Sequence, residues 1–482
     1  MTVPQGILPF KIELLEEAEK VTAHAALPLL IETMRALCPP EAWRPLADAL
    51  GYQDAGVVQR HTESLVALMA GGGDHASDLD VLGGDLGLEK LIGFSLSSPT
   101  QAKDFLYRFH QSEEGKPLLP CDDDVLSVVG KAQIRPEGPG LRALATWSAA
   151  TVAAVQTVQP RDTATLDVDA TIAGAHKKRA LVAYEGTRGY QPQMAWWAEQ
   201  NVWVCDEFRD GNVPAAYKVK DFLVRAFGSL PATVLRRRLR ADSALYDEAA
   251  LTWADDEDIE FAVSADMSEA LAAKVMAIPE QEWGPYKNLK DKTPTEERQW
   301  AEVLDFIPGW KRNHKKEGEA LRYIAIRVRP LQKDLFQEEH TAWRHFAVVS
   351  NMNWQGDRLL RWHREKQGTV EFAHGVLKGD LAGGVLPCGR FGANAAWWRL
   401  NVLTHNLLQL LKIQALPTEL HAVRLKTLRF QLLHLPGRVV HHARSWILKL
   451  YGGFPFAAAL LAARQKLLAL RALLHPPPLS PV

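Results

Sequence analysis

Apolar residues in the first third of the chain recur at helical spacing. Between residues 27 and 37 they lie three or four positions apart, as one face of a packed helix requires. Pro39-Pro40 and the glycines at 71–73 interrupt this pattern, as residues that end helices do. The small polar residues 97–100 precede a mixed basic and aromatic helix over 103–109. We therefore predict that residues 1–155 form a helical N-terminal domain.

From about residue 163 the pattern changes to short apolar runs that are typical of β-strands. We predict strands over 164–169, 180–184, 202–205, 233–240 and 259–265, and a helix over 215–226. Strands followed by a helix and a further strand are the order of a ribonuclease H-like core, although many α/β folds share it. The segment 156–265 is thus predicted as the first part of an α/β core, with the ribonuclease H-like fold as our interpretation.

The rest of the chain is predicted to interrupt this core and then complete it. Residues 266–355 are polar and contain strands over 323–328 and 346–350, so we interpret them as a β-rich insertion. Residues 356–412 contain a long apolar helix and are predicted as the second part of the core. Residues 413–482 form a basic C-terminal region.

The charges are balanced in number but uneven in position. The 482 residues include 56 Lys and Arg and 57 Asp and Glu, so net charge alone indicates no partner. From Lys412 onward, however, ten Lys or Arg face one acid, Glu419. A segment nine charges positive favours contact with a polyanion.

Neither secretion nor a membrane span is predicted. The four cysteines, at 38, 121, 205 and 388, are far apart and show no metal-ligand spacing, which suits a reducing compartment. The N-terminus lacks a basic and apolar signal segment. The most apolar stretch, 454–474, is interrupted by three basic residues. We therefore expect a cytoplasmic protein without a membrane partner.

Three carboxylates stand where a fold could bring them to shared metal ions. Asp169 would end the first strand, Asp242 follows the strand 233–240, and Glu371 begins a helical run. Mg²⁺ prefers hard oxygen ligands, so such carboxylates can form a working site. Lys378 lies two helical turns after Glu371, on the same face, and could hold a phosphate.

The residues alone leave alternatives to this assignment. With 57 acids in the chain, any choice of three is a weak signal. Asp167 shares the strand face of Asp169 and competes as the first ligand. For the basic run His176, Lys177 and Lys178, a solvated loop is favoured over a functional site.

At these positions the sequence resembles bacterial insertion-sequence transposases of the DDE class, specifically the insertion-sequence 1380 group. The matching segments are 72–85, 97–100, 166–171 with 176–178, 189–192, 208–212, 240–243, 368–378 and 392–397. The separations of 73 residues between Asp169 and Asp242 and 129 between Asp242 and Glu371 agree with a core that carries an insertion before its last acid.

The resemblance implies roles for individual residues. Asp169, Asp242 and Glu371 become the catalytic, metal-binding triad, and Lys378 becomes the basic residue downstream of the Glu. Related transposases often carry Tyr and Arg seven and four residues before the Glu, where this chain has Arg364 and Gln367.

The remaining basic residues of the matching segments are expected to contact DNA. Arg364 or Lys366 would then contact phosphate in place of the usual residues, and Arg240 and His176–Lys178 are further expected DNA contacts. An aromatic that stacks on a flipped base could come from Trp283, Trp310 or Trp354, although core packing is favoured for each.

The function implied is that of a transposase. It would bind the terminal inverted repeats of its element, cleave DNA with two Mg²⁺ ions (Mn²⁺ as substitute) and join 3′ ends to target DNA, acting as a dimer on DNA in the bacterial cytoplasm and nucleoid. Two alternatives remain: a catalytically inactive DNA-binding descendant, and a structure-specific nuclease on the same fold. Retention of all three acids and Lys378 argues against the first.

Overall fold

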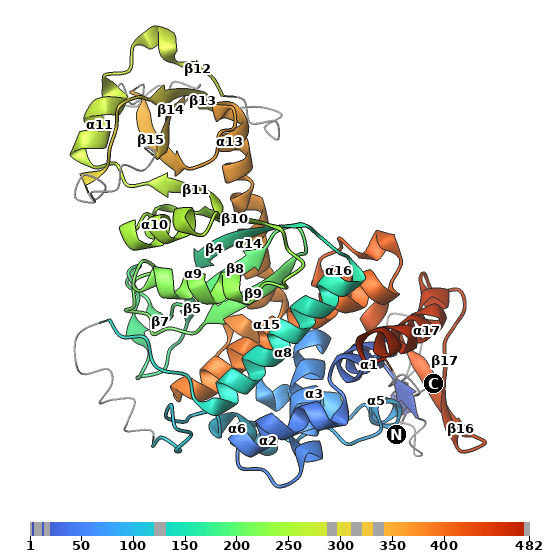
Figure 1. Cartoon of the computed structure of the whole chain (residues 1–482). Coiled ribbons are helices and arrows are strands. Elements are labelled where there is room, and N and C mark those ends of the chain that lie inside the picture. The colour runs from blue at the N-terminus through green and yellow to red at the C-terminus, as the bar shows by residue number, and fades with distance from the viewer. Residues whose placement is uncertain are drawn as a thin grey trace, which may run out of the picture. The chain divides into compact units, whose positions relative to one another are not determined.

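The helices and strands of the chain fall into two units (Figure 1). The structure, a computed structural model, describes residues 2–3, 12–13, 20–119, 132–286, 296–309, 321–330 and 342–476. The first unit comprises residues 1–109, 380–382 and 407–482, and the second comprises 110–379 and 383–406. Both ends of the chain thus contribute to the first unit.

A mixed sheet of nine strands forms the centre of the second unit, in the order β12-β13-β14-β15-β11-β10-β4-β8-β9. Its strands are β4 (Thr163–Ala170), β8 (Gln193–Trp197), β9 (Val202–Glu207), β10 (Arg236–Ala241), β11 (Glu260–Ala265), β12 (Gly284–Pro285), β13 (Glu296–Val303), β14 (Arg322–Pro330) and β15 (Arg344–Ser350). β4, β10 and β11 run parallel, and the other pairings are antiparallel. The predicted α/β class is confirmed.

The segment 266–355 extends this sheet. β15 pairs with β11, with Val349 opposite Val263, and β14, β13 and β12 follow outward. The segment also contains a helix, α11 (Glu269–Met276). The strand predicted over 180–184 is shorter than expected and does not belong to the large sheet. It is β6 (Leu181–Val182), which pairs with β7 (Arg188–Tyr190), and β7 also pairs with β5 (Ala173–Gly174) in a separate small sheet.

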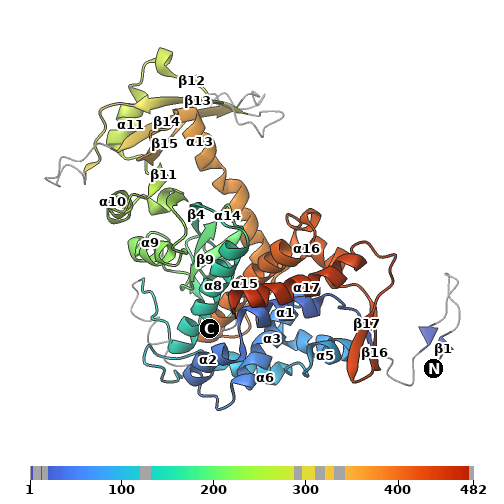
Figure 2. The ribbon, with the colours of Figure 1, turned by 45° about the vertical axis from the view of Figure 1, so that its right-hand side comes forward.

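Helices cover both faces of the strands β4, β8 and β9 (Figure 2). They are α8 (Pro139–Val158), α9 (Val219–Gly228), α14 (Lys366–Gly375) and α15 (Phe391–Ala415), whereas α10 (Glu248–Asp256) and α13 (Gly356–Arg364) contact β11. Neighbouring residues of a strand point to opposite faces. Asp206 of β9 binds Arg399 of α15, whereas Glu207 binds Arg225 of α9, so these two helices lie on opposite faces.

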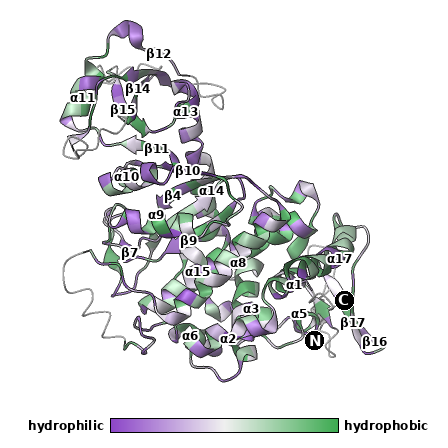
Figure 3. Cartoon of the chain, viewed as in Figure 1, coloured by the Kyte–Doolittle hydropathy of each residue, from purple (hydrophilic) through white to green (hydrophobic). Residues whose placement is uncertain are grey.

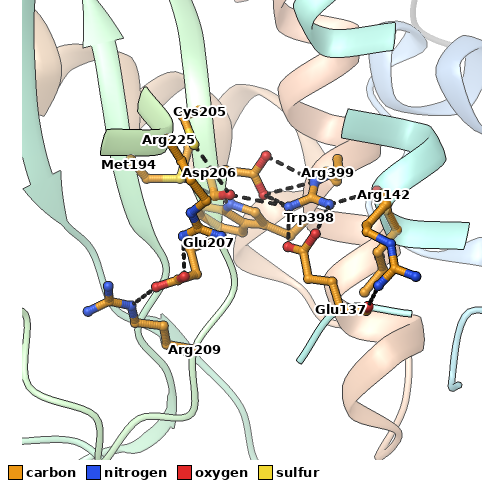
Figure 4. A network of polar contacts seen from close by, with 11 residues as sticks. Glu137, Arg142, Met194, Cys205, Asp206, Glu207, Arg209, Arg225, Trp398 and Arg399 are labelled. Atoms are coloured by element: carbon orange, nitrogen blue, oxygen red, sulfur yellow. Dashed lines mark hydrogen bonds and ion pairs between the residues drawn. The ribbon is translucent and has the colours of Figure 1, made fainter. Parts of the chain in front are cut away.

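Arg399 is the centre of a buried polar network that fixes α15 to β9 (Figure 4). Its guanidinium contacts both carboxylate oxygens of Asp206 at 3.1–3.2 Å and both of Glu137 at 2.7–3.0 Å, and it donates to the Leu141 carbonyl. Although burial lowers the pKa of Arg399, the two carboxylates raise it well above its usual value. Arg399 is 3% exposed and therefore stays charged inside the protein.

An apolar cluster holds α13 against the far half of the sheet. It contains Ala262, Tyr286, Ile324, Val348, Met352, Leu359 and Leu360, with Trp300, Ile326, Trp354 and Trp362 packed on it. Gly356 begins α13 beneath Trp300, and a Cβ at this position would lie 2.3 Å from the indole ring. Only glycine lets the helix approach the sheet this closely.

The first unit is helical with a small sheet. Its elements are β3 (Val21–Thr22), α1 (Leu27–Leu37), α2 (Arg44–Ala49), α3 (Ala55–Gly71), α4 (Leu79–Gly83), α5 (Leu86–Ile92), α6 (Pro99–Tyr107), α16 (Leu425–Leu428), β16 (Gly437–His442), β17 (Ser445–Lys449) and α17 (Ala457–Leu474). Apolar residues predominate in α1 and α17, which pack together (Figure 3). The helix predicted over 103–109 is α6, which begins earlier, at Pro99, because Ser98 caps it by accepting from the Gln101 N–H.

Candidate active site

Two of the three predicted acids stand at neighbouring strand ends. β4 and β10 are parallel, with Asp167 opposite Arg240 and Val168 opposite Ala241. Asp169 and Asp242 therefore follow at the same level, at the carboxyl edge that parallel strands share. Asp242 accepts from the Ala244 N–H through Oδ1 at 3.1 Å, and its Oδ2 lies 3.9 Å from the Lys366 Nζ.

The third acid reaches the same place from α14, which is fastened to the two strands. His363, near the end of α13, binds the Ala241 carbonyl through Nε2 at 3.0 Å. Arg240 donates to the Trp362 carbonyl at 2.7 Å, and Thr369 donates to Asp167. The junction between α13 and α14 is thus fixed against β4 and β10.

A cavity of about 1150 Å³ contains all three acids in its lining. Asp169, Asp242 and Glu371 line it together with basic residues, Arg298, Arg344, Arg364 and Lys366. Arg298 and Arg344 both pair with Glu296, at 3.0 and 2.9 Å. A wall that carries carboxylates beside guanidinium groups suits a substrate that bears phosphates and reacts at a metal site.

The acids interact electrostatically. Burial, with smaller contributions from Asp242 and Glu371, raises the pKa of Asp169 to about 6 against the opposing effect of Lys366. The Lys366 Nζ lies 3.4 Å from Asp169 Oδ1 and 3.9 Å from Asp242 Oδ2. The side chain of Asp169 is 18% exposed and that of Asp242 is 51% exposed.

The structure distinguishes Asp169 from its competitor Asp167. Asp167 is fully buried and receives two hydrogen bonds from Arg240, at 2.6 and 3.0 Å, in addition to the one from Thr369. Its oxygens are used within the protein, whereas Asp169 lines the cavity. Asp167 therefore acts as a structural acid that orients β4, β10 and α14.

Among the basic residues, Arg240 requires a correction. It is 2% exposed and bonded to Asp167, so it lies in the core and is not available to DNA as predicted. His176, Lys177 and Lys178 are exposed after β5, and the cavity lining does not include them. Their placement agrees with the solvated loop favoured from the sequence.

Lys378 lies in a π-helical turn, Val376–Asp380, that continues α14. Its Nζ donates to the Ile172 carbonyl at 3.4 Å, and burial lowers its pKa while Glu185 and Asp169 oppose that change. π-Helical turns occur often at functional sites. The charge of Asp169 thus influences Lys378, although the described residues show no ion pair between these two side chains.

The sequence residues 62–472 match the family model described as Transposase DDE domain group 1. The chain belongs to the DDE transposases. The predicted enzyme class is therefore confirmed, and transposases of this class generally depend on divalent metal ions.

Two other comparisons add less. A solved structure of piggyBac transposase in a synaptic complex with hairpin DNA is 11% identical, with a TM-score of 0.45 over 93% of this chain and 80% of that chain. No curated protein sequence matches the transposase.

The donor chemistry of the transposase site fits a hard divalent cation, since three carboxylates line one cavity and two of them, Asp242 and Glu371, raise the pKa of the third, Asp169. In the described residues, however, no three His, Cys, Asp or Glu side chains are gathered closely enough to hold a metal ion, so the three carboxylates would have to approach one another when an ion binds. The cation nearest to Asp169 and Asp242 is instead the Lys366 ammonium.

His374 is a site residue that sequence reasoning missed. Its Nε2 lies 3.7 Å from Asp169 Oδ2, and its ring packs on Trp203 with centroids 5.0 Å apart. Burial lowers its pKa to about 3, so the ring is neutral behind the carboxylate. His374 is three residues after Glu371, and this helical spacing was the signal that could have indicated it.

The tryptophans considered for base stacking have different surroundings. Trp354 packs on the apolar cluster of α13 and on Trp362, as core packing predicts. Trp283 contacts Arg327 and His345, and Trp310 lies outside the described residues. None of the cavity-lining residues is a tryptophan in the described part of the transposase.

Proposed function

We propose that this transposase cleaves DNA phosphodiesters with Asp169, Asp242 and Glu371 as its catalytic residues. We further propose that its catalytic core has the ribonuclease H-like fold and that the protein belongs to the insertion-sequence 1380 group. The observation that carries the proposal is one cavity that contains all three acids and a basic wall. When bound there, divalent ions, Mg²⁺ in the first place, would activate the attacking hydroxyl and stabilise the leaving oxygen. The three carboxylates would hold them.

The protein residues supply orientation and charge. Arg344 and Arg364 on the cavity wall would bind phosphates of the DNA strand, and Lys378 would hold a phosphate near Glu371. Because Arg298 and Arg344 already share Glu296, a phosphate would compete with one carboxylate. Cleavage would expose a 3′ hydroxyl, which the same site would direct at target DNA.

Purified protein on DNA with the ends of its own element, with Mg²⁺ or Mn²⁺, tests this proposal. Asp169→Asn should abolish cleavage and leave DNA binding largely intact. Asp266→Asn is the matched control, because Asp266 follows β11 as Asp242 follows β10 but does not line the cavity. Cleavage that survives Asp169→Asn would refute the assignment. Joined products separate a transposase from a nuclease that only cuts.

We propose that the basic C-terminal region binds the terminal inverted repeats. No acid follows Glu419, and the hairpin of β16 and β17 exposes Arg438, Arg444 and Lys449. Its turn places Ala443 and Arg444 at φ 47° and 64°, the left-handed conformation that a two-residue hairpin turn requires, and both residues are exposed. Together with the helices of the first 155 residues, this hairpin would contact phosphates.

Salt dependence tests the hairpin. Replacing its three basic residues by alanine should flatten the plot of log affinity against log salt by up to about 0.9 for each phosphate that the hairpin no longer neutralises. Lys274→Ala on α11 is the control and should leave the slope unchanged. An unchanged slope in the triple variant would show that the hairpin does not bind DNA.

Because the two ends of the element must meet, we propose that the protein acts as a dimer on DNA, which mass measurements of the complex would test.

A further inference from the structure

Lys366 occupies a position between two carboxylates of the proposed metal site. Its ammonium is 3.4 Å from Asp169 and 3.9 Å from Asp242, and the residue is 8% exposed. Most surface lysines extend into solvent, and a lysine is rarely buried without a charge partner. The placement therefore indicates a defined electrostatic role.

The backbone around Lys366 is fixed to the strands that carry the acids. Lys366 is the first residue of α14, three residues after His363, which binds the Ala241 carbonyl. Thr369, one helical turn later, donates to Asp167. Because both ends of this turn are held, the backbone of Lys366 stays beside the strands that carry the acids, and its ammonium reaches Asp169 and Asp242 from there.

We propose that Lys366 is an internal counter-cation of the site: it neutralises Asp169 and Asp242 before metal binds, and an incoming divalent cation displaces it. This inference rests on the metal site of the proposed function. It changes the role expected for Lys366 from a direct DNA contact to control of metal entry.

The physical reason is charge balance. Two carboxylates that share a partly buried site repel each other, and a single ammonium relieves that repulsion. A divalent cation at the same oxygens would be repelled by the ammonium, so binding requires that the Lys366 side chain moves away. Since Lys366 lines the cavity, the displaced ammonium remains where a phosphate of the substrate would lie.

Calorimetric titration of the full chain with Mn²⁺, without DNA, tests the inference. Lys366→Met should raise the affinity for Mn²⁺ about tenfold or more, because removal of one positive charge a few ångströms from a dication eliminates a strong repulsion. Lys366→Arg should bind Mn²⁺ about as weakly as wild type. Arg364→Met is the control for general loss of positive charge and should change the affinity by much less.

The outcomes separate this inference from the proposed function. Equal Mn²⁺ affinity in wild type and Lys366→Met would leave the metal site in place and overturn the role of Lys366. Absence of binding in every variant would overturn the metal site and this inference with it. Tighter binding by Lys366→Met alone supports both.

A second measurement uses only the wild-type protein, so it does not depend on whether a variant folds. Brief acetylation followed by peptide mass spectrometry reports how accessible each lysine is. Mn²⁺ should increase the labelling of Lys366 severalfold while the exposed Lys274 stays unchanged as the internal reference. Labelling of Lys366 that stays constant or falls with Mn²⁺ would contradict displacement.

Discussion

The Arg399 network allows a quantitative test of what holds the sheet to α15. In Arg399→Met the side-chain volume is largely kept, but buried Asp206 and half-buried Glu137 lose the guanidinium that contacts all four of their oxygens. Removing one partner of a buried ion pair costs about 3–5 kcal/mol, because the remaining charge has no compensation. We expect a loss of that size in the free energy of unfolding.

The same network predicts how the loss depends on pH. Burial raises the pKa of Asp206, and Arg399 is the first group that opposes this rise. Without Arg399, folded Asp206 binds a proton more tightly than unfolded Asp206 does. A carboxyl whose folded pKa lies above its unfolded pKa loses stability as pH rises. Arg399→Met should therefore be less destabilised at pH 5 than at pH 8.

Urea denaturation of both proteins at the two pH values measures this. Arg142→Met is the matched control, because Arg142 is exposed and contacts the backbone carbonyl of Glu137. It should lose less than about 1 kcal/mol, as exposed charges do. A loss below about 1 kcal/mol in Arg399→Met, or a larger loss at pH 5 than at pH 8, would refute the reasoning.

Two further predictions concern stability. Burial lowers the pKa of Lys412 to about 8, which means that the charged ammonium is less stable in the folded protein than in the unfolded chain. Lys412→Met should therefore raise the free energy of unfolding by up to about 2 kcal/mol at pH 7. Denaturation at pH 10 should show a smaller gain, because folded Lys412 is already neutral there. Gly356→Ala should cost about 1–3 kcal/mol because the new Cβ meets Trp300, and Gly228→Ala, which meets nothing within 4 Å, should cost nothing in the same thermal melts.

Several strands with apolar runs could be predicted from the sequence, but β8, whose five residues are all buried, was missed. β4, β11, β14 and β15 agree with the predicted positions because their buried residues form such runs. β13 was missed, since its sequence begins Glu296-Glu297-Arg298 and its charges are satisfied by arginines of β14 and β15. Cross-strand ion pairs of this kind depend on register, which one segment of sequence does not contain.

Some features of the site could likewise be predicted from the sequence, whereas others depend on tertiary contacts. Strand ends and helical spacing made Asp169, Asp242 and Glu371 candidates, and the resemblance to DDE transposases selected them from the other acids. The fold brings these three residues to one cavity. Whether Asp167 or Asp169 faces that cavity depended on Arg240, a residue 73 positions away that binds Asp167 in the core. The burial of Lys366 likewise results from tertiary contacts, so a basic residue in a motif looked like a DNA contact until its neighbours were known.

The first unit has a consequence for biosynthesis. β3 pairs with β16, and α1 packs against α17, although more than 400 residues separate α1 from α17 in the chain. During translation α1 and β3 are made more than 400 residues before their partners α17 and β16, so they remain unpaired until those partners are synthesised. A premature stop after residue 406 would therefore damage the beginning of the protein as well as its end, while the strands that carry Asp169 and Asp242 would already have been made.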